Sequence, residues 1–204
     1  MKIIGLTGPS GAGKSTLCEK FEELGIPCIN TDNIYHSITG FSSPCVNELT
    51  ELFGEEILDE KGGLNRPALA KLVFEGENAK SNLAELNAIA HKYVWEETNK
   101  ILTQYINRGK RVAVIDAPAL FSSKIFIGAC DLIISVLCDR ETRIERITKR
   151  DNISRERVIA RMDAQPSDEF FIKNSDYCIN NGSSKEEMTE QLYSIFEQEG
   201  IYLK

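Results

Sequence analysis

Short apolar runs rich in β-branched residues alternate along the chain with segments in which apolar residues recur at helical spacing. The run Lys2–Thr7, KIIGLT, is typical of a buried strand, and Leu17, Phe21 and Leu24 follow it on one helical face. This alternation predicts an α/β fold in which a five-stranded parallel sheet is flanked by helices on both faces. The predicted strands are Ile3–Thr7, Cys28–Thr31, Val112–Asp116, Leu132–Leu137 and Tyr177–Ile179.

The connection between the second and third predicted strands is too long for a single crossover. It contains three segments of helical period, VNELTELF, RPALAKLVF and KSNLAELNAIAHKYVWEETNKILTQYINR. We therefore expect a helical insert that covers the ligand crevice at the carboxyl ends of the strands. The predicted single domain has a core (1–36, 108–141 and 164–204), an insert (37–107) and an Arg-rich lid (142–163).

The stretch GLTGPSGAGKST, Gly5–Thr16, lies between the first strand and the first helix and fits the pattern G-x-x-x-x-G-K-[ST]. Glycines let successive backbone N–H groups point inward at phosphate oxygens, and the following helix aims its positive end at the same place. The sequence thus predicts a P-loop, with a glycine-rich turn that binds no ligand as the alternative. The predicted nucleotide-binding residues are Gly8, Ser10, Gly11, Ala12, Gly13, Lys14, Ser15 and Thr16.

Composition limits the kinds of partner that the protein can bind and the compartments in which it is expected. The formal net charge of −7 argues against a nucleic-acid partner, and no apolar run approaches the length of about 18 residues that a membrane span needs. The six cysteines are scattered, without C-x-x-C, so we expect reduced thiols rather than a zinc site. The chain begins directly with the first strand and shows no signal-peptide pattern, which favours a cytoplasmic protein.

A basic segment from Thr142, TRIERITKRDNISRERVIARMDAQ, stands out in this acidic chain. Arg143, Arg146 and Arg150 share one helical face, and Ser154 is the expected N-cap of a second helix. Mobile guanidinium groups on such a segment suit a lid that closes over phosphates and offsets charge during transfer. The alternative is a solvated helical hairpin held by charge pairs.

The other P-loop classes fit less well. A GTPase needs N-K-x-D after a strand, but Asn99–Lys100 is followed by Ile101 and Leu102 within a helical segment. The Ser-Gly-Gly signature of transporter ATPases is absent. A small chain with a helical insert and an Arg-rich segment favours a kinase of small molecules.

In its ordered motifs the chain resembles the dephospho-coenzyme A kinase family, which transfers the ATP γ-phosphate to the ribose 3′-hydroxyl of dephospho-CoA. The resemblance implies ATP as donor, Mg²⁺ as its metal and dephospho-CoA as acceptor. It runs over nearly the whole chain, through IIGLTGPSGAGKST, LGIPCINTDNIYH, GGLNRPALAKLVF, LNAIAHKYV, VAVIDAPALF, ITKRDNISRERVIARMDAQ and NSDYCINNG.

The same comparison and the strand ends supply candidate site residues. Asp32, taken as the end of the second strand, is the expected general base, with a helix N-cap as the alternative. Lys14, Arg146 and Arg150 complete the expected catalytic set. Ser15 and Asp116 are the expected metal-binding pair, although Asp116 also suits a strand-end turn.

Two further residues are assigned to the acceptor. Arg66 has a guanidinium fork suited to phosphate, although it also suits a surface charge at a helix start beside Pro67. His91 is assigned only through the resemblance, since a lone histidine in a helical segment is more often structural.

The chain departs from the family pattern at two positions. Lys92 stands where the family commonly has Pro, and Ser122 stands where it commonly has Glu. Ser122 bears on the acceptor or metal environment beside the third strand, so altered acceptor preference or weak activity stays open. The alternative functions are a P-loop kinase of another nucleoside or small metabolite, and an ATP-binding sensor that performs no transfer.

Overall fold

The computed structural model describes residues 1–182 and 184–202. The chain forms two compact units. The sheet unit comprises Met1–Ile29 and Ile106–Lys204, and the helical unit comprises Asn30–Tyr105. No helix in the described residues is both long enough and apolar enough to cross a membrane.

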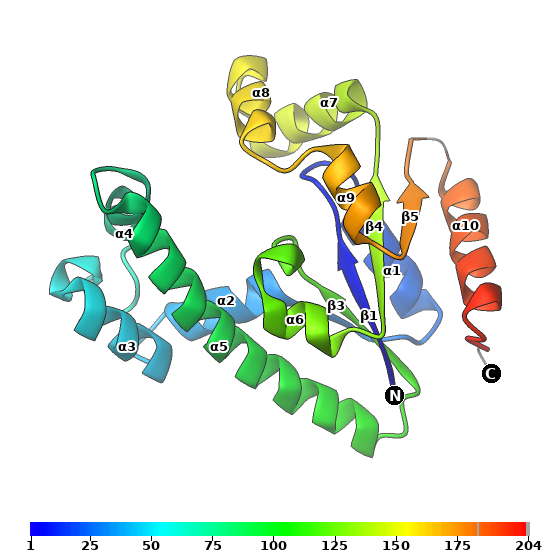
Figure 1. The fold of residues 1–204 in the computed structure, drawn as a ribbon, viewed down its shortest axis with the longest axis horizontal. Helices are drawn as coiled ribbons and strands as arrows, with labels where there is room; N and C mark the ends of the chain where they lie inside the picture. The colour runs from blue at the N-terminus through cyan, green and yellow to red at the C-terminus, as the bar shows by residue number, and fades with distance from the viewer. Residues whose placement is uncertain (183, 203–204) are drawn as a thin grey trace. The chain divides into compact units, whose positions relative to one another are not determined.

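Five strands in the order β2-β3-β1-β4-β5 form the sheet. Figure 1 shows β3, β1, β4 and β5. β1 pairs in parallel with β3 and β4, and β4 pairs in parallel with β5. Leu6 lies opposite Asp116 in the register of β1 and β3, so the carboxyl ends of these strands meet at one edge. The strands are β1 (Lys2–Thr7), β2 (Cys28–Asn30), β3 (Val112–Asp116), β4 (Leu132–Leu137) and β5 (Tyr177–Asn180).

Helices cover both faces of the sheet. Ile4 and Leu6 of β1 enter a buried cluster with apolar residues of α1 and α10. Gly5, between them, faces the other side, where Leu120 and Cys130 fill the space that a side chain would need. The predicted α/β fold with a five-stranded sheet is confirmed. The helices of this unit are α1 (Lys14–Glu23), η2 (Leu120–Ser122), α6 (Lys124–Ala129), α7 (Arg140–Asp151), α8 (Arg155–Asp163), α9 (Asp168–Asn174) and α10 (Lys185–Gln198).

The Arg-rich segment forms the hairpin of α7 and α8. Its apolar residues pack into a small cluster of their own, which includes Ile144 and Met162. The Ser154 side chain accepts a hydrogen bond from the backbone N–H of Arg157, so the predicted N-cap is confirmed.

The second strand is shorter than predicted. It ends at Asn30, and Thr31 already begins α2 (Thr31–Thr39). The side chain of Asn30 accepts a 2.8 Å hydrogen bond from the backbone N–H of Asn33 and is the N-cap. The placement of Asp32 at the strand end was therefore wrong, and so was its alternative role as N-cap. Asp32 lies in the first turn of α2, where a negative charge interacts favourably with the helix dipole.

The helical unit is built around its own apolar core. Leu49, Leu69 and Leu86 bring three helices together in one buried cluster. The segments predicted to be helical over this part of the chain are helical. Besides α2, the helices are α3 (Pro44–Phe53), η1 (Glu55–Ile57), α4 (Arg66–Phe74) and α5 (Ala79–Asn107), of which α5 carries the chain back to β3.

Candidate active site

The nucleotide-binding loop connects the carboxyl end of β1 to the first turn of α1. Gly8, Gly11 and Gly13 have φ angles of 140°, 78° and 95°, which residues with a Cβ rarely adopt. At Gly13 a Cβ would also overlap Nδ2 of Asn181. The path of the loop therefore requires glycine at this position.

The amino end of α1 offers a site for an anion. Gly13 is the N-cap and gives the first turn no side-chain hydrogen bond, so its backbone N–H groups and the positive end of the helix dipole face outward. The Lys14 ammonium folds back over the loop and donates to the carbonyl oxygen of Gly8 at 3.4 Å. Ser15 follows as the next residue of the helix. The backbone donors of the first turn, the Lys14 ammonium and Ser15 thus all lie at the start of α1.

Arg146 of α7 contacts this loop directly. Its Nη1 donates to the carbonyl oxygen of Gly11 at 3.4 Å, and its Nη2 donates to the carbonyl oxygen of Asn181 at 3.1 Å. Nδ2 of Asn181 in turn donates to the carbonyl oxygen of Ala12 at 2.8 Å. The Arg-rich helix and the end of β5 are therefore tied to the outside of the loop.

Arg150, the second arginine of the expected catalytic set, lies near the far end of α7. Its guanidinium pairs with Asp151 at 2.6 and 3.0 Å, and Arg161 of α8 donates to the same carboxylate at 2.8 Å. More than half of the Arg150 side chain is exposed. Among the contacts seen in the described residues, only Arg146 of the two reaches the loop.

Asp116 lies at the carboxyl end of β3 and is 6% exposed. The pKa of the Cys18 thiol lies far above its usual range. A hydrogen bond with Cys28 is the largest cause, followed by burial and by the negative charge of Asp116, while the charge of Lys14 acts in the opposite direction. Cys18 lies one turn after Lys14 and Ser15 on α1. Asp116 lies opposite Leu6 in the register of β1 and β3, so it stands at the end of the sheet from which the nucleotide-binding loop begins.

These groups fit a magnesium ion carried by a nucleotide. In the described part of the chain no group of three or more His, Cys, Asp or Glu side chains could hold a metal. Magnesium, however, is commonly bound by one or two protein oxygens together with substrate phosphates and waters. The Ser15 hydroxyl and the Asp116 carboxylate are oxygen ligands of that kind.

The residues expected to bind the acceptor, Asp32, Arg66 and His91, all belong to the helical unit. Asp32 is exposed, and Tyr35 and Thr39 follow it on α2 at i+3 and i+7, on the same helix face. Arg66 contacts α2 on this face.

Arg66, the first residue of α4, is held against α2. Its Nη2 donates to Oγ1 of Thr39 at 2.9 Å, and its Cζ lies 5.3 Å from the centre of the Tyr35 ring. Thr39 is buried and donates to the carbonyl oxygen of Tyr35 at 2.6 Å. Burial raises the pKa of Tyr35, and the charge of Arg66 opposes this. The guanidinium is thus positioned along the face that carries Asp32.

His91 lies on a different helix, midway along α5, and is half-buried. Burial lowers its pKa, which favours the neutral imidazole near neutral pH.

The two departures from the family pattern have local structural roles. Lys92 donates to Oε2 of Glu48 at 2.7 Å, and the Tyr93 hydroxyl donates to the same oxygen at 2.6 Å, which lowers the pKa of Glu48. Lys92 thereby links α5 to α3 at the surface. The hydroxyl of Ser122 donates to the carbonyl oxygen of Ala119 at 2.7 Å within the short helix η2.

Sequence reasoning missed several residues that contact the site. Asn181 and Gln165 lie in segments that carried the family resemblance, but their partners on the loop are 169 and 155 positions away. Arg143 was expected in the lid and is instead buried against the loop. Tyr35 also lies in a segment that carried the resemblance, LGIPCINTDNIYH, but it was given no role there.

A parallel sheet with a glycine-rich phosphate loop between β1 and α1 defines a P-loop nucleotide-binding fold, and the solved structures that resemble it include kinases. A solved structure of a protein from Thermus thermophilus covers 97% of both chains, with 29% identity and a TM-score of 0.77. Shikimate kinase from Acinetobacter baumannii shares the fold, at 14% identity and a TM-score of 0.54, over 100% of this chain and 96% of that one.

The family model for dephospho-CoA kinase matches residues 2–187. A dephospho-CoA kinase of Bacillus cereus is 38% identical over 199 residues, which are 98% of each chain. The chain therefore belongs to the dephospho-CoA kinase family. It is a kinase that acts in the last step of coenzyme A biosynthesis.

Proposed function

We propose that the chain transfers the γ-phosphate of ATP to the ribose 3′-hydroxyl of dephospho-CoA. ATP would bind to the sheet unit and the acceptor to the helical unit. One observation carries the donor side: the Lys14 ammonium folds over a loop that ends at the uncapped amino end of α1. This arrangement suits the β- and γ-phosphates of a nucleoside triphosphate.

On the donor side, the loop residues Gly8–Thr16 hold the phosphate chain through backbone N–H groups. Lys14 neutralises charge that develops on the β–γ bridging oxygen and the γ-phosphate as the bond between them breaks. Arg146, already bound to the carbonyl oxygen of Gly11, adds a second cation at the same edge. Arg150 would join it by exchanging Asp151 for a phosphate oxygen.

The metal of the reaction would be Mg²⁺, with Ser15 as a direct ligand and Asp116 acting on its hydration shell. When bound, the ion neutralises phosphate charge. The hydroxyl of Ser15 lies at the start of α1, and Asp116 is a buried carboxylate at the end of the sheet from which the loop begins.

On the acceptor side, Asp32 would take the proton of the 3′-hydroxyl as that oxygen attacks the γ-phosphorus, and ADP would leave with the bridging oxygen. Its exposed place in the first turn of α2 supports this role, because the carboxylate is open to a substrate. Arg66 would bind an acceptor phosphate, and His91 would contribute a neutral imidazole to acceptor binding.

A cytoplasmic location belongs to the same proposal. All six cysteines are free thiols, as is usual for proteins of a reducing compartment.

The experiment is a product assay with purified protein, ATP, Mg²⁺ and dephospho-CoA, read by mass spectrometry. A product heavier by one phosphate, with the phosphate located at the ribose 3′ position by fragmentation, is expected. Nucleosides, shikimate and pantetheine phosphates serve as competing acceptors. Faster transfer to one of these would show that dephospho-CoA is not the preferred acceptor. ATP binding without transfer to any acceptor would favour an ATP-binding sensor.

A further inference from the structure

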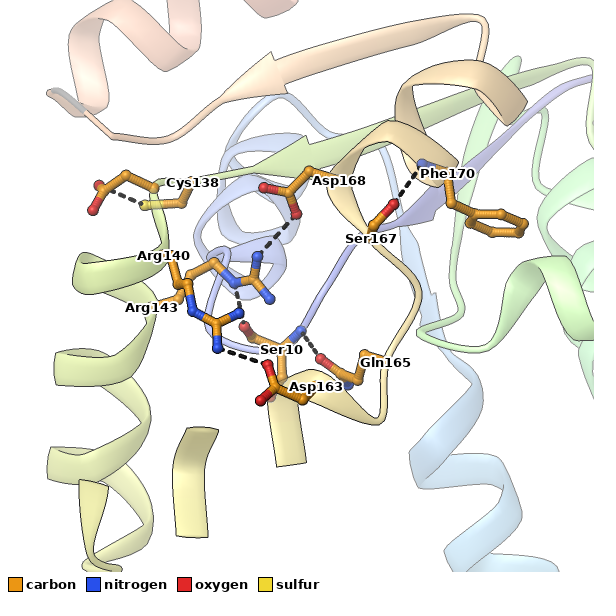
Figure 2. A network of polar contacts seen from close by, with 10 residues as sticks. Ser10, Cys138, Arg140, Arg143, Asp163, Gln165, Ser167, Asp168 and Phe170 are labelled. Carbon is orange, nitrogen blue, oxygen red and sulfur yellow. Dashed lines mark hydrogen bonds and ion pairs between the residues drawn. The ribbon is translucent and has the colours of Figure 1, made fainter. Parts of the chain in front are cut away.

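Ser10 in the nucleotide-binding loop is held on both sides by side chains from distant segments. Its backbone N–H donates to Oε1 of Gln165 at 3.0 Å, and its carbonyl oxygen accepts from Nε of Arg143 at 3.1 Å (Figure 2). Gln165 lies in the connection between α8 and α9, and Arg143 lies on α7. Both peptide groups of Ser10 are therefore fixed from outside the loop.

Arg143 is itself locked in place. It is 5% exposed, and its Nη1 pairs with Oδ1 of Asp168 at 2.9 Å. Burying a guanidinium costs free energy unless its charge is paired, and Arg143 is paired with Asp168 and also donates to the Ser10 carbonyl oxygen. Arg143 is therefore a fixed support of the loop and not one of the mobile arginines expected for a lid.

The hydrogen bond on the Ser10 carbonyl has a consequence for the next residue. In a planar trans peptide the C=O and the following N–H point in opposite directions. Because Arg143 holds the Ser10 carbonyl oxygen outward, the N–H of Gly11 is turned to the inner side of the loop, where a phosphate would lie. Asn181 acts in the same way on the carbonyl oxygen of Ala12 and hence on the N–H of Gly13.

We infer that Arg143, Gln165 and Asp168 are positioning residues for the nucleotide, a role that rests on the proposed binding of ATP to this loop. Arg143 and Gln165 fix the two peptides of Ser10, and Asp168 holds Arg143. Their loss lets the Ser10–Gly11 peptide rotate, so the loop presents fewer aligned donors to the phosphates. The residues proposed to bind the acceptor belong to the helical unit and take no part in these contacts.

Arg140 provides a matched control on the same helix. It forms a 2.6 Å ion pair with Asp163 of α8 and so ties the hairpin together, but its partner is not in the loop. Arg140→Met and Arg143→Met therefore make the same substitution on α7, and each removes one ion pair. Only the second removes a hydrogen bond to the nucleotide-binding loop.

The test measures ADP and ATP affinity by isothermal titration calorimetry, and then KM for each substrate. Arg143→Met, Asp168→Asn and Gln165→Met should each weaken nucleotide binding by about 10-fold, because each leaves a peptide group of the loop or its support without a partner. KM for ATP should rise in proportion while KM for the acceptor stays the same. Arg140→Met should bind nucleotide like the parent, and Asp168→Glu, which keeps the carboxylate, should restore most of the affinity.

If Arg143→Met fails to fold, Asp168→Asn and Gln165→Met decide the question. Folded variants that bind ADP like the parent would overturn the inference, and so would equal rises in both KM values. Because nucleotide affinity is measured without acceptor, a parent that binds ATP but does not phosphorylate dephospho-CoA would refute the proposed function and leave this inference testable. A parent that binds no ATP would overturn both.

Discussion

The side-chain amide of Asn181 donates a 2.8 Å hydrogen bond to the carbonyl oxygen of Ala12, which lies 169 positions earlier in the chain. Asn181 is 6% exposed, and its backbone carbonyl oxygen accepts a hydrogen bond from Arg146. The residue that follows β5 thus holds one peptide of the nucleotide-binding loop. It does so at the one point where Gly13 leaves room for the asparagine side chain.

Gly13→Ala should therefore strain the backbone and also displace the Asn181 side chain. Gly13 and Gly109 have similar positive φ angles of 95° and 73°, but a Cβ at Gly109 meets nothing within 4 Å. Gly109→Ala should lower the free energy of unfolding by about 1 kcal/mol and leave ADP affinity unchanged. Gly13→Ala should weaken ADP binding by about 10-fold or more, because Asn181 and the loop must shift apart. Equal ADP affinities by calorimetry would contradict this.

The fold could be predicted because its determinants are local. The run Lys2–Thr7 is apolar and β-branched, the loop glycines need positive φ, and Ser154 precedes a helix in its own segment. The end of the second strand was misjudged because Asn30, Thr31 and Asp32 are all polar and each suits a cap. Only the hydrogen bond from Asn33 to Asn30 decides where α2 begins.

The contacts around the site could not be predicted, since they join residues far apart in sequence. Arg143, Arg146 and Arg150 share one helical face, yet one is a buried support, one contacts the loop and one pairs with Asp151. Spacing places these residues on the same face of α7, but it carries no information about what packs against each turn.

Lys14→Ala should lower kcat by about 100-fold or more, because the ammonium is a preorganised donor to charge that grows during transfer. Lys20→Ala is the control on the same helix, where the lysine pairs with the exposed carboxylate of Glu23 at 3.1 Å. Steady-state kinetics at saturating ATP compare the two. Near-parental turnover of Lys14→Ala would refute the role proposed for this residue.

If Arg66 binds an acceptor phosphate as proposed, Arg66→Met should raise KM for the acceptor by about 10-fold and leave KM for ATP unchanged. Tyr35→Phe tests how the guanidinium is held. The ring lies 5.3 Å from Cζ of Arg66, so keeping the ring should keep the acceptor KM, whereas Tyr35→Ala should raise it. Parallel changes in both KM values for Arg66→Met would argue for a structural role.

The stability of the protein should fall as the pH is lowered from about 7.5 to 5.5, in part through His91. Burial lowers the pKa of His91 in the folded state, so the unfolded chain binds more protons in this range and its free energy falls relative to that of the folded chain. Denaturant unfolding at several pH values should show a shallower loss for His91→Asn. A parental slope for His91→Asn would exclude this contribution.

Asp32 can now be tested without the ambiguity of helix capping, because Asn30 is the N-cap of α2. Asn30→Ala should lower the free energy of unfolding by about 1 kcal/mol and change kcat little. Asp32→Asn should change stability by less than about 1 kcal/mol, since it removes only a first-turn charge. If Asp32 is the base that accepts the 3′-hydroxyl proton, however, kcat should fall by about 100- to 10,000-fold with little change in ATP affinity. Turnover of dephospho-CoA by Asp32→Asn within a few-fold of the parent would show that another group takes the proton.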